Sequence, residues 1–405
     1  MKGFCRVLAV FFLAMGLILP VSEAYAASRD EKIATLQKAG LVTGYPDGTL
    51  GLDKPIKRSE ISVLLLRMMG RTVEGAGLET FEDVPSDHWA SGYIYEARLL
   101  KSKTGVKLIS GYPDNTFKPE KNITNAEIMK ILVVMARPGL TPQAVQTAKW
   151  PSSWIAWADE MGIIGAGSDL GNLNPNAPAK RGDVFTMIYN AAASTVGPGE
   201  PVNFQPVPKS VTTPGAAIRK PLPKNYIAAF NSGSYFDHRA FQQEFLRIMN
   251  IDRGYNGLPP LQWAEDLTKG TVQRSQELAD YGSVEVNGRG HVRCDGRLWD
   301  TAFDYLQPQF QTTDRGENLL NMPFYQSKNT MVVECKLLLS DPYYMARYCY
   351  AQWWSSPEHR ANMMDPNYRY ANVQVRVSPK SRLINRAGAE VVNFTVTTVF
   401  RGEYQ

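Results

Sequence analysis

The sequence predicts a multidomain chain in which an all-α bundle of three repeats is followed by an α+β domain. Three observations predict this. One motif recurs three times before residue 195, and each copy leads into an apolar stripe with helical spacing. A proline-rich stretch follows the repeats. Beyond that stretch, helical patterns come first and strand patterns come last, which is typical of an α+β domain.

The composition limits the classes of function. The chain has 405 residues with 44 basic and 39 acidic side chains, which gives a net charge of +5. This near balance argues against a general nucleic-acid binder, because such a protein needs a basic surplus on one face. The length and the hydrophobic content of 44% are sufficient for two or three domains with separate cores.

Residues 1–26 have the pattern of a secretory signal peptide. Lys2 and Arg6 supply the positive region, residues 7–19 are apolar, and residues 24–26 give the small-x-small pattern of a cleavage site. An uncleaved membrane anchor is the alternative, but this apolar run is short for a bilayer and no later run reaches 18 residues. We therefore expect an exported protein without a transmembrane segment.

Three cysteines remain after the predicted cleavage, namely Cys294, Cys335 and Cys349. An odd number in a compartment that permits disulfides is compatible with one pair and one free thiol, or with a fully reduced set. Three cysteines do not make a disulfide scaffold, so the fold must depend on its hydrophobic cores.

The repeated motif has two clear copies and one degenerate copy. Residues 44–49 (Gly-Tyr-Pro-Asp-Gly-Thr) match residues 111–116, and the same offset of 67 carries 56–60 onto 123–127. The third copy runs from Gly167 to Asp183. The apolar stripes after the copies are Ile61, Leu64, Leu65 and Met68; Ile128, Ile131, Leu132 and Met135; and Val184, Met187, Ile188 and Ala191. We place the repeats at 27–72, 77–138 and 147–194 and expect their helices to pack around a shared axis.

Arginine stands at the start of two of the three motif helices. Arg58 and Arg181 fall in the first helical turn, and residues 124–127 form a capping box at the start of the second helix. Free N–H groups, the positive helix end and a guanidinium would together make an anion site. The alternative is an arginine that is simply solvated, but repetition around an axis favours ligand binding.

These residues resemble the S-layer homology (SLH) family. The resemblance rests on the Gly-Tyr-Pro-Asp-Gly-Thr turn, on Ile-Lys-Arg-Ser-Glu at 56–60, and on Asp83-Val84 with His88-Trp89-Ala90, with Trp154 as the counterpart of Trp89. In that family three repeats form a pseudo-threefold prism at the cell-wall or S-layer surface. The prism holds an anionic, often pyruvylated, secondary cell-wall polysaccharide through the motif arginines.

The resemblance assigns a polymer-binding surface residue by residue. Arg58 and Arg181 are the expected contacts, together with the motif glutamates Glu60 and Glu127 and with Trp89 and Trp154. Asn125 occupies the arginine position of the second copy, so we expect poor anion binding there.

Residues 195–235 are predicted to form a linker. Seven prolines occur between Pro198 and Pro223. Because proline fixes φ and lacks an N–H group, this stretch is predicted to be an extended spacer.

The last part of the chain, 236–402, is the predicted α+β domain. Helical spacing predicts helices over about 236–250 and 264–281. Alternating valines at 373–377 and a Val/Thr/Phe-rich run at 391–400 predict strands.

Two histidines and one glutamate in this domain lie beside structure breakers, namely His291, His359 and Glu317. If they converge, two imidazoles and a carboxylate could hold a divalent ion such as zinc. A hydrogen-bonded polar cluster is the other interpretation, and spacing alone favours it.

This domain resembles the CAP superfamily (cysteine-rich secretory proteins, antigen 5, pathogenesis-related 1) in its bacterial form. The matching residues are Asn250 with Arg253, residues 258–263, His291 with Asp295-Gly296, residues 316–318, and Trp354 ahead of residues 356–362. The family fold is an α-β-α sandwich with a cleft lined by two histidines and two glutamates. The resemblance places His291, Glu317 and His359 in that cleft, with Glu334 and Glu358 as candidates for the fourth position.

Two functions stay open for that cleft. It could bind a lipid, peptide or glycan with or without a metal, or it could belong to a metal-dependent hydrolase in which His or Glu activates water. Cys294, three residues after His291, is a weak candidate for a nucleophile or a further ligand. Binding is the favoured interpretation, and whether the protein is an enzyme is left undecided.

Overall fold

The computed structural model describes residues 27–45, 47–196, 202, 204, 217–323, 335–381 and 392–404. The predicted signal peptide and residues 197–201, 203 and 205–216 of the predicted linker lie outside these residues. The chain divides into two compact units between residues 216 and 217, and each is described by itself. Among the described residues, no helix has both the length and the apolar character needed to cross a membrane.

The first unit is built from seven helices within the described residues: α3 (Arg29–Lys38), α4 (Arg58–Met68), α5 (Ser91–Ala97), α6 (Asn125–Ala136), α7 (Pro142–Thr147), α8 (Ser152–Glu160) and α9 (Arg181–Ala193). The helices that follow the three motif copies are α4, α6 and α9, and they begin at the expected positions. Nearly all of their predicted stripe residues are buried in one hydrophobic core, with Met135 packed at its edge. The predicted capping box also forms, since the Thr124 hydroxyl accepts from the Glu127 N–H and the Glu127 carboxylate accepts from the Thr124 N–H.

The three repeats are joined in a closed cycle. Each short helix packs against the long helix of the preceding repeat: α5 on α4, α8 on α6, and α3 on α9, which closes the ring. The segments just before the long helices make the same cycle through their backbones. Ile56 N–H donates to Ala179 (3.1 Å), Ala179 N–H donates to Ile123 (2.8 Å), and Ile123 N–H donates back to Ile56 (3.0 Å).

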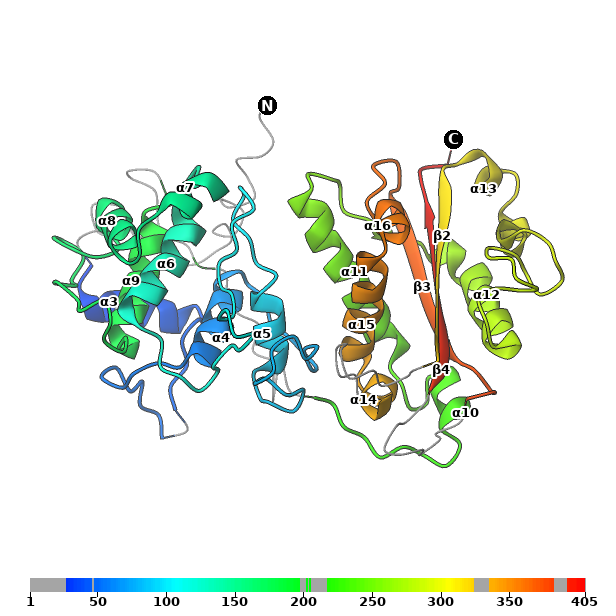
Figure 1. The fold of residues 1–405 in the computed structure, drawn as a ribbon, viewed down its shortest axis with the longest axis horizontal. Helices are drawn as coiled ribbons and strands as arrows, with labels where there is room; N and C mark the ends of the chain where they lie inside the picture. The colour runs from blue at the N-terminus through cyan, green and yellow to red at the C-terminus, as the bar shows by residue number, and fades with distance from the viewer. Residues whose placement is uncertain are drawn as a thin grey trace. The chain divides into compact units, whose positions relative to one another are not determined.

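The second unit is a four-stranded mixed sheet between two layers of helices (Figure 1). Its strands are β1 (Gln262–Trp263), β2 (Arg315–Pro323), β3 (Tyr370–Val377) and β4 (Asn393–Arg401), in the order β1-β3-β4-β2, with only β1 and β3 parallel. One layer contains α11 (His238–Tyr255), α14 (Cys335–Ser340), α15 (Pro342–Ser355) and α16 (Pro357–Met363). The other contains α12 (Thr268–Tyr281), the 3-10 turns η2 (Glu265–Leu267) and η3 (Trp299–Leu306), and α13 (Gln309–Thr312).

The predicted helices and strands of this unit are largely confirmed. The helix expected over 236–250 is α11, which continues to Tyr255, and the helix expected over 264–281 begins as η2 and continues as α12. The predicted strands correspond to β3 and β4. The sequence did not predict β2, which carries Glu317 and pairs antiparallel with β4, with Glu317 opposite Val399.

The predicted linker is too long at its C-terminal end. The second unit begins at 217, not at 236, because residues of the expected linker pack into it. Ile218 N–H donates to Asp341 (3.1 Å), and α10 (Tyr226–Asn231) is bonded to β3 through the Asn231 amide, which donates to and accepts from Val377. At the other end, Val202 and Phe204 join the core of the first unit.

Candidate functional sites

Arg58 lies at the contact between the first and second repeats, together with Tyr112 and Glu127. Its Nε donates to the Phe117 carbonyl (2.8 Å), its Nη2 donates to the Ser110 carbonyl (3.1 Å), and its Nη1 lies 3.4 Å from Glu127 Oε1. The guanidinium carbon is 4.6 Å from the centroid of the Tyr112 ring, and the arginine is buried. We call this set the Tyr112 junction.

Arg181 has the same surroundings at the contact between the third and first repeats. Its Nε donates to the Leu50 carbonyl (3.0 Å), its Nη1 is paired with Glu60, and its guanidinium carbon is 4.9 Å from the Tyr45 ring centroid. Leu50, Tyr45 and Glu60 each precede their counterparts in the Tyr112 junction by the repeat offset of 67 residues. The same arrangement is therefore built twice, and we call this second set the Tyr45 junction.

The expectation of free N–H groups at the helix starts is wrong. The first N–H groups of the three long helices, at Arg58, Asn125 and Arg181, donate to Lys121 (3.0 Å), Ala177 (3.1 Å) and Lys54 (2.9 Å). The following residues donate to carbonyls of the same neighbouring segments. Neighbouring repeats have already satisfied these donors, so the positive features of the junctions are side chains.

The third junction is the contact between the second and third repeats. It has Asn125 where the other two junctions have a motif arginine. Asn125 donates from Nδ2 to the Asn174 carbonyl (2.9 Å). Asp183, which stands at the position of Glu127, is paired with Arg29 of α3 (2.8 Å). The cation at this junction comes from another helix and has its own carboxylate.

Glu127 is held in its charged form. Although burial raises the pKa of Glu127, the Thr124 N–H, the Tyr112 hydroxyl (2.8 Å) and the charge of Arg58 together leave it below its usual value. The Tyr112 junction therefore combines a fixed carboxylate with a fixed guanidinium.

The two tryptophans expected at the polymer surface differ in exposure. Trp89 is 43% exposed, whereas Trp154 is 4% exposed and packs edge-on against Trp157 with ring centroids 5.1 Å apart. The structural counterpart of Trp89 is Trp150, which is 55% exposed.

The pairing of Trp154 with Trp89 was wrong because Trp154 corresponds to the buried Tyr93. Trp89 and Trp150 each directly precede the N-cap of their helix, at Ala90 and Pro151. Each also lies eight residues before a fully buried alanine, Ala97 or Ala158. Counting back from that alanine would have identified Trp150 in the sequence.

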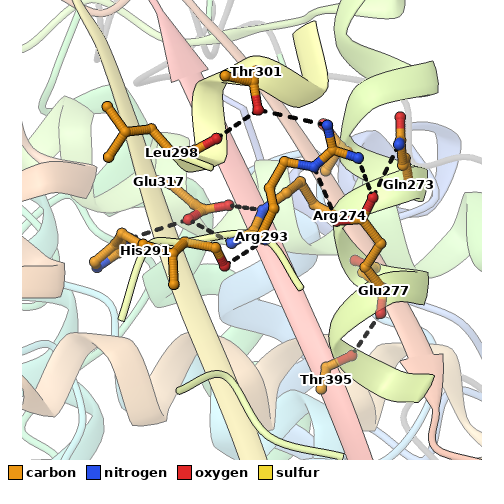
Figure 2. A network of polar contacts seen from close by, with 12 residues as sticks. Gln273, Arg274, Glu277, His291, Arg293, Leu298, Thr301, Glu317 and Thr395 are labelled. Carbon is orange, nitrogen blue, oxygen red and sulfur yellow. Dashed lines mark hydrogen bonds and ion pairs between the residues drawn. The ribbon is translucent and has the colours of Figure 1, made fainter. Parts of the chain in front are cut away.

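In the second unit the structure brings Glu317, His291 and Arg274 together (Figure 2). Arg274 Nε lies 2.9 Å from Glu317 Oε1 and its Nη2 lies 3.2 Å from Oε2, and both side chains are fully buried. His291 Nδ1 lies 3.1 Å from Glu317 Oε2, while half of the imidazole stays exposed. The third Arg274 contact is to the Val292 carbonyl, so this arginine also fixes the loop that carries His291.

His359 lies on α16, which packs beside β2. Burial lowers the pKa of His359, and His291 adds to this effect. The Asn318 side chain, on the residue after Glu317, donates to the His359 carbonyl (3.0 Å). The structure thus brings His291 and Glu317 together, and the approach of the His359 imidazole to them stays a prediction.

This cluster does not fit a divalent metal ion. Among the described residues, no group of three His, Cys, Asp or Glu side chains is arranged to hold one. Both oxygens of Glu317 already have partners, and the Arg274 guanidinium supplies the positive charge that a metal would bring. Glu358 is exposed, and Glu334 lies outside the described residues.

Cys294 is also a poor nucleophile or ligand. Its thiol donates to the Glu277 carbonyl (3.4 Å), and burial together with nearby carboxylates raises its pKa. The thiolate form, which attacks and ligates, is therefore disfavoured.

Arg274 was missed by sequence reasoning. It lies on α12 among other polar residues, and its partner Glu317 is 43 positions away. Nothing in the local pattern separates it from a solvated arginine.

Comparisons with known proteins agree with this two-part organisation. The profile of the S-layer homology domain matches residues 23–61 and 107–129, and that of the cysteine-rich secretory protein family (CAP) matches residues 246–384. A middle cell wall protein of Brevibacillus brevis is 34% identical over 169 residues, which are 41% of this chain and 14% of that protein.

Two other relatives are a surface layer protein and an anchoring protein. A surface layer protein of Brevibacillus choshinensis is 32% identical over 41% of this chain and 14% of its own length. A cellulosome-anchoring protein of Acetivibrio thermocellus is 27% identical over 43% of this chain and 40% of its own length. The chain therefore matches only a minor part of each of these relatives.

Proposed function

Because the chain carries S-layer homology sequence at its N-terminus and a CAP domain at its C-terminus, we propose that it is a wall-anchored display protein. The N-terminal unit, a pseudo-threefold SLH bundle, would bind secondary cell-wall polysaccharide non-covalently through anionic, pyruvylated sugars. The CAP domain would then be presented at the cell surface.

The observation that carries this proposal is the junction that is built twice. In each copy a motif arginine, a tyrosine ring and a glutamate meet where two repeats touch. Arginine presents a planar fork that suits carboxylates, and an aromatic ring beside it offers a face for a sugar. The exposed rings of Trp89 and Trp150 add two further apolar faces on the same unit.

The protein is located at the cell wall or S-layer surface. This location agrees with the pattern of residues 1–26 and with the SLH match. The relatives named above are cell-wall, surface-layer or anchoring proteins by name.

For the CAP domain we propose ligand binding without a metal at the cluster of His291, Glu317 and His359. The ligand class, whether lipid, peptide or glycan, is left open by the residues. A metal-dependent hydrolase receives no support from the described residues, because Arg274 occupies the carboxylate that such a site would need.

Sedimentation with isolated sacculi tests the anchoring. The mature full-length chain should pellet with sacculi that retain their polysaccharide and stay in solution with stripped peptidoglycan. Arg58→Ala and Arg181→Ala should each weaken binding about ten-fold, because a charge-assisted contact contributes about 1.5–3 kcal/mol.

The matched control is Arg239→Ala, which removes an exposed arginine of the second unit. It should pellet like the unchanged chain, and circular dichroism below the melting temperature should verify that each variant is folded. Equal pelleting with bare peptidoglycan, or wild-type binding by the folded double arginine variant, would refute wall-polymer anchoring.

A further inference from the structure

Tyr112 is surrounded by cations. Besides Arg58 beneath the ring, Lys118 Nζ lies 4.5 Å and Lys121 Nζ lies 5.1 Å from the ring centroid. Lys121 Nζ also lies 3.2 Å from the Tyr112 hydroxyl oxygen and donates to it. The neighbouring carboxylates are Glu127, which accepts from the same hydroxyl, and Asp114, which is paired with Lys118 (3.1 Å).

A fourth cation, Lys130, lies on α6 one turn after Glu127. Lys130 Nζ donates to the carbonyls of Lys107 (3.1 Å) and Leu108 (2.9 Å), which are neutral acceptors. Burial lowers the pKa of Lys130, and the charge of Arg58 adds to this effect. The positive charge on this side of the Tyr112 junction therefore exceeds what Glu127 and Asp114 neutralise.

The other junctions carry less positive charge at the corresponding positions. Over Tyr45 lie Arg181 and Lys54, the counterpart of Lys121, but Gly51 stands where Lys118 would be. At the third junction the positions of Tyr112, Lys118 and Lys121 hold Ser168, Asn174 and Ala177. The positive charge at these positions thus decreases from the Tyr112 junction to the Tyr45 junction and then to the third junction.

The backbone at Lys118 adds independent evidence that the side chain has a function. Lys118 has φ 56° and its counterpart Gly51 has φ 57°, so both turns use the left-handed conformation. Glycine adopts it without steric cost, whereas lysine does not. Since the sister repeat builds the same turn with glycine, the fold does not require lysine at 118, and a strained residue is retained there.

We propose that the Tyr112 junction is the preferred site for a carboxylate of the wall polysaccharide and that Lys118 and Lys121 determine this preference. The inference rests on the proposed anchoring function. It adds which junction binds most tightly and which two lysines are responsible.

The test compares two glycine substitutions in the same turn of the full-length mature chain. Lys118→Gly removes a cation and a left-handed lysine, and Asn115→Gly removes only a left-handed asparagine (φ 58°). The probe is polysaccharide released from the sacculi, with affinity measured by isothermal titration calorimetry and Tm by circular dichroism. Lys118→Gly should bind at least five-fold more weakly with an unchanged or raised Tm, whereas Asn115→Gly should keep wild-type affinity.

A second pair compares equivalent positions of the two junctions. Lys121→Ala should weaken binding more than Lys54→Ala. Polysaccharide with its carboxyl groups reduced to alcohols should bind weakly to every variant and lose the difference between wild type and Lys118→Gly.

The outcomes separate this inference from the anchoring proposal. If the wild type does not bind the polysaccharide at all, anchoring itself fails. If the wild type binds but Lys118→Gly stays within two-fold of it, or Lys54→Ala is the more damaging change, the preference for the Tyr112 junction is overturned. A loss of affinity in Lys118→Gly that is accompanied by a lower Tm would also overturn it, because lysine would then be structural.

Discussion

Lys130 is a cation placed among neutral acceptors. Burial lowers the pKa of Lys130 from its ordinary value of 10.5 to about 8, and the charge of Arg58 on α4 adds to this effect. The other groups that face it are the carbonyls of Lys107 and Leu108, and Glu127 lies one turn earlier on its own helix. The ammonium is therefore less stable here than in water.

This depressed pKa predicts a pH dependence of stability. Between about pH 8 and 10.5 the unfolded chain binds more protons at Lys130 than the folded chain, so the free energy of unfolding should rise with pH across that window. Lys130→Met should remove this contribution and make the profile of the variant flatter than that of the wild type. Urea unfolding from pH 7 to 10.5 measures it, and identical slopes in both proteins would contradict the assignment.

Arg274 and Glu317 are a fully buried ion pair, and each depends on the other. Arg274→Met should destabilise the second unit by about 3–5 kcal/mol, because it leaves the Glu317 charge buried without its partner. Arg274→Met combined with Glu317→Leu should recover most of that loss. Denaturant unfolding followed by tryptophan fluorescence checks both, and a double variant no better than the single one would argue against charge burial as the cause.

At the scale of elements, β2 and α16 meet through a glycine. A Cβ atom added at Gly316 would come within 2.4 Å of the Tyr368 hydroxyl oxygen and 2.5 Å of Asn362 Oδ1. Asn362 also donates to the Glu317 carbonyl and to the Asn318 side chain, so this contact aligns α16, and with it His359, against β2.

Gly316→Ala should therefore destabilise the second unit by about 1–3 kcal/mol, as expected for overpacking. It should also shift the NMR signals of the His359 imidazole. Gly290→Ala is the matched control, because nothing lies within 4 Å of an added Cβ there. If the two alanine variants were equally stable, the close approach at Gly316 would not be a constraint.

Local patterns predicted the elements better than the contacts between them. The stripes of α4, α6 and α9 repeat every three to four residues, so the helices and their buried faces followed from spacing alone. The register that makes residues 315–323 a strand is set by β4, which lies about 80 residues later, and no local alternation marks it.

The same limit applies to the sites. The approach of His291 to Glu317 was predicted from a family motif, whereas Arg274 neutralises Glu317 from the buried side of α12, where no local signal marks it. The motif arginines were predicted, but the satisfied helix ends depend on carbonyls from neighbouring repeats that only the assembled ring brings close.

At the scale of the whole molecule, the chain joins two units with separate cores. The first unit has one core that all three repeats share, and the second has hydrophobic clusters of its own. A ligand-binding change in one unit can therefore be measured without rebuilding the core of the other, which is why Arg239→Ala in the second unit controls for the arginine variants of the first.

The closed cycle of backbone bonds through Ile56, Ala179 and Ile123 also affects how the first unit responds to a pulling force. In an open solenoid, a pull on one end peels the repeats off in order, because each touches only its neighbours. Here α9, the last helix before the spacer, also holds α3, the first helix of the ring. A pull on the C-terminal end of α9 is therefore shared by the first and third repeats at once, and the first unit resists it as a closed ring instead of unfolding repeat by repeat from one end.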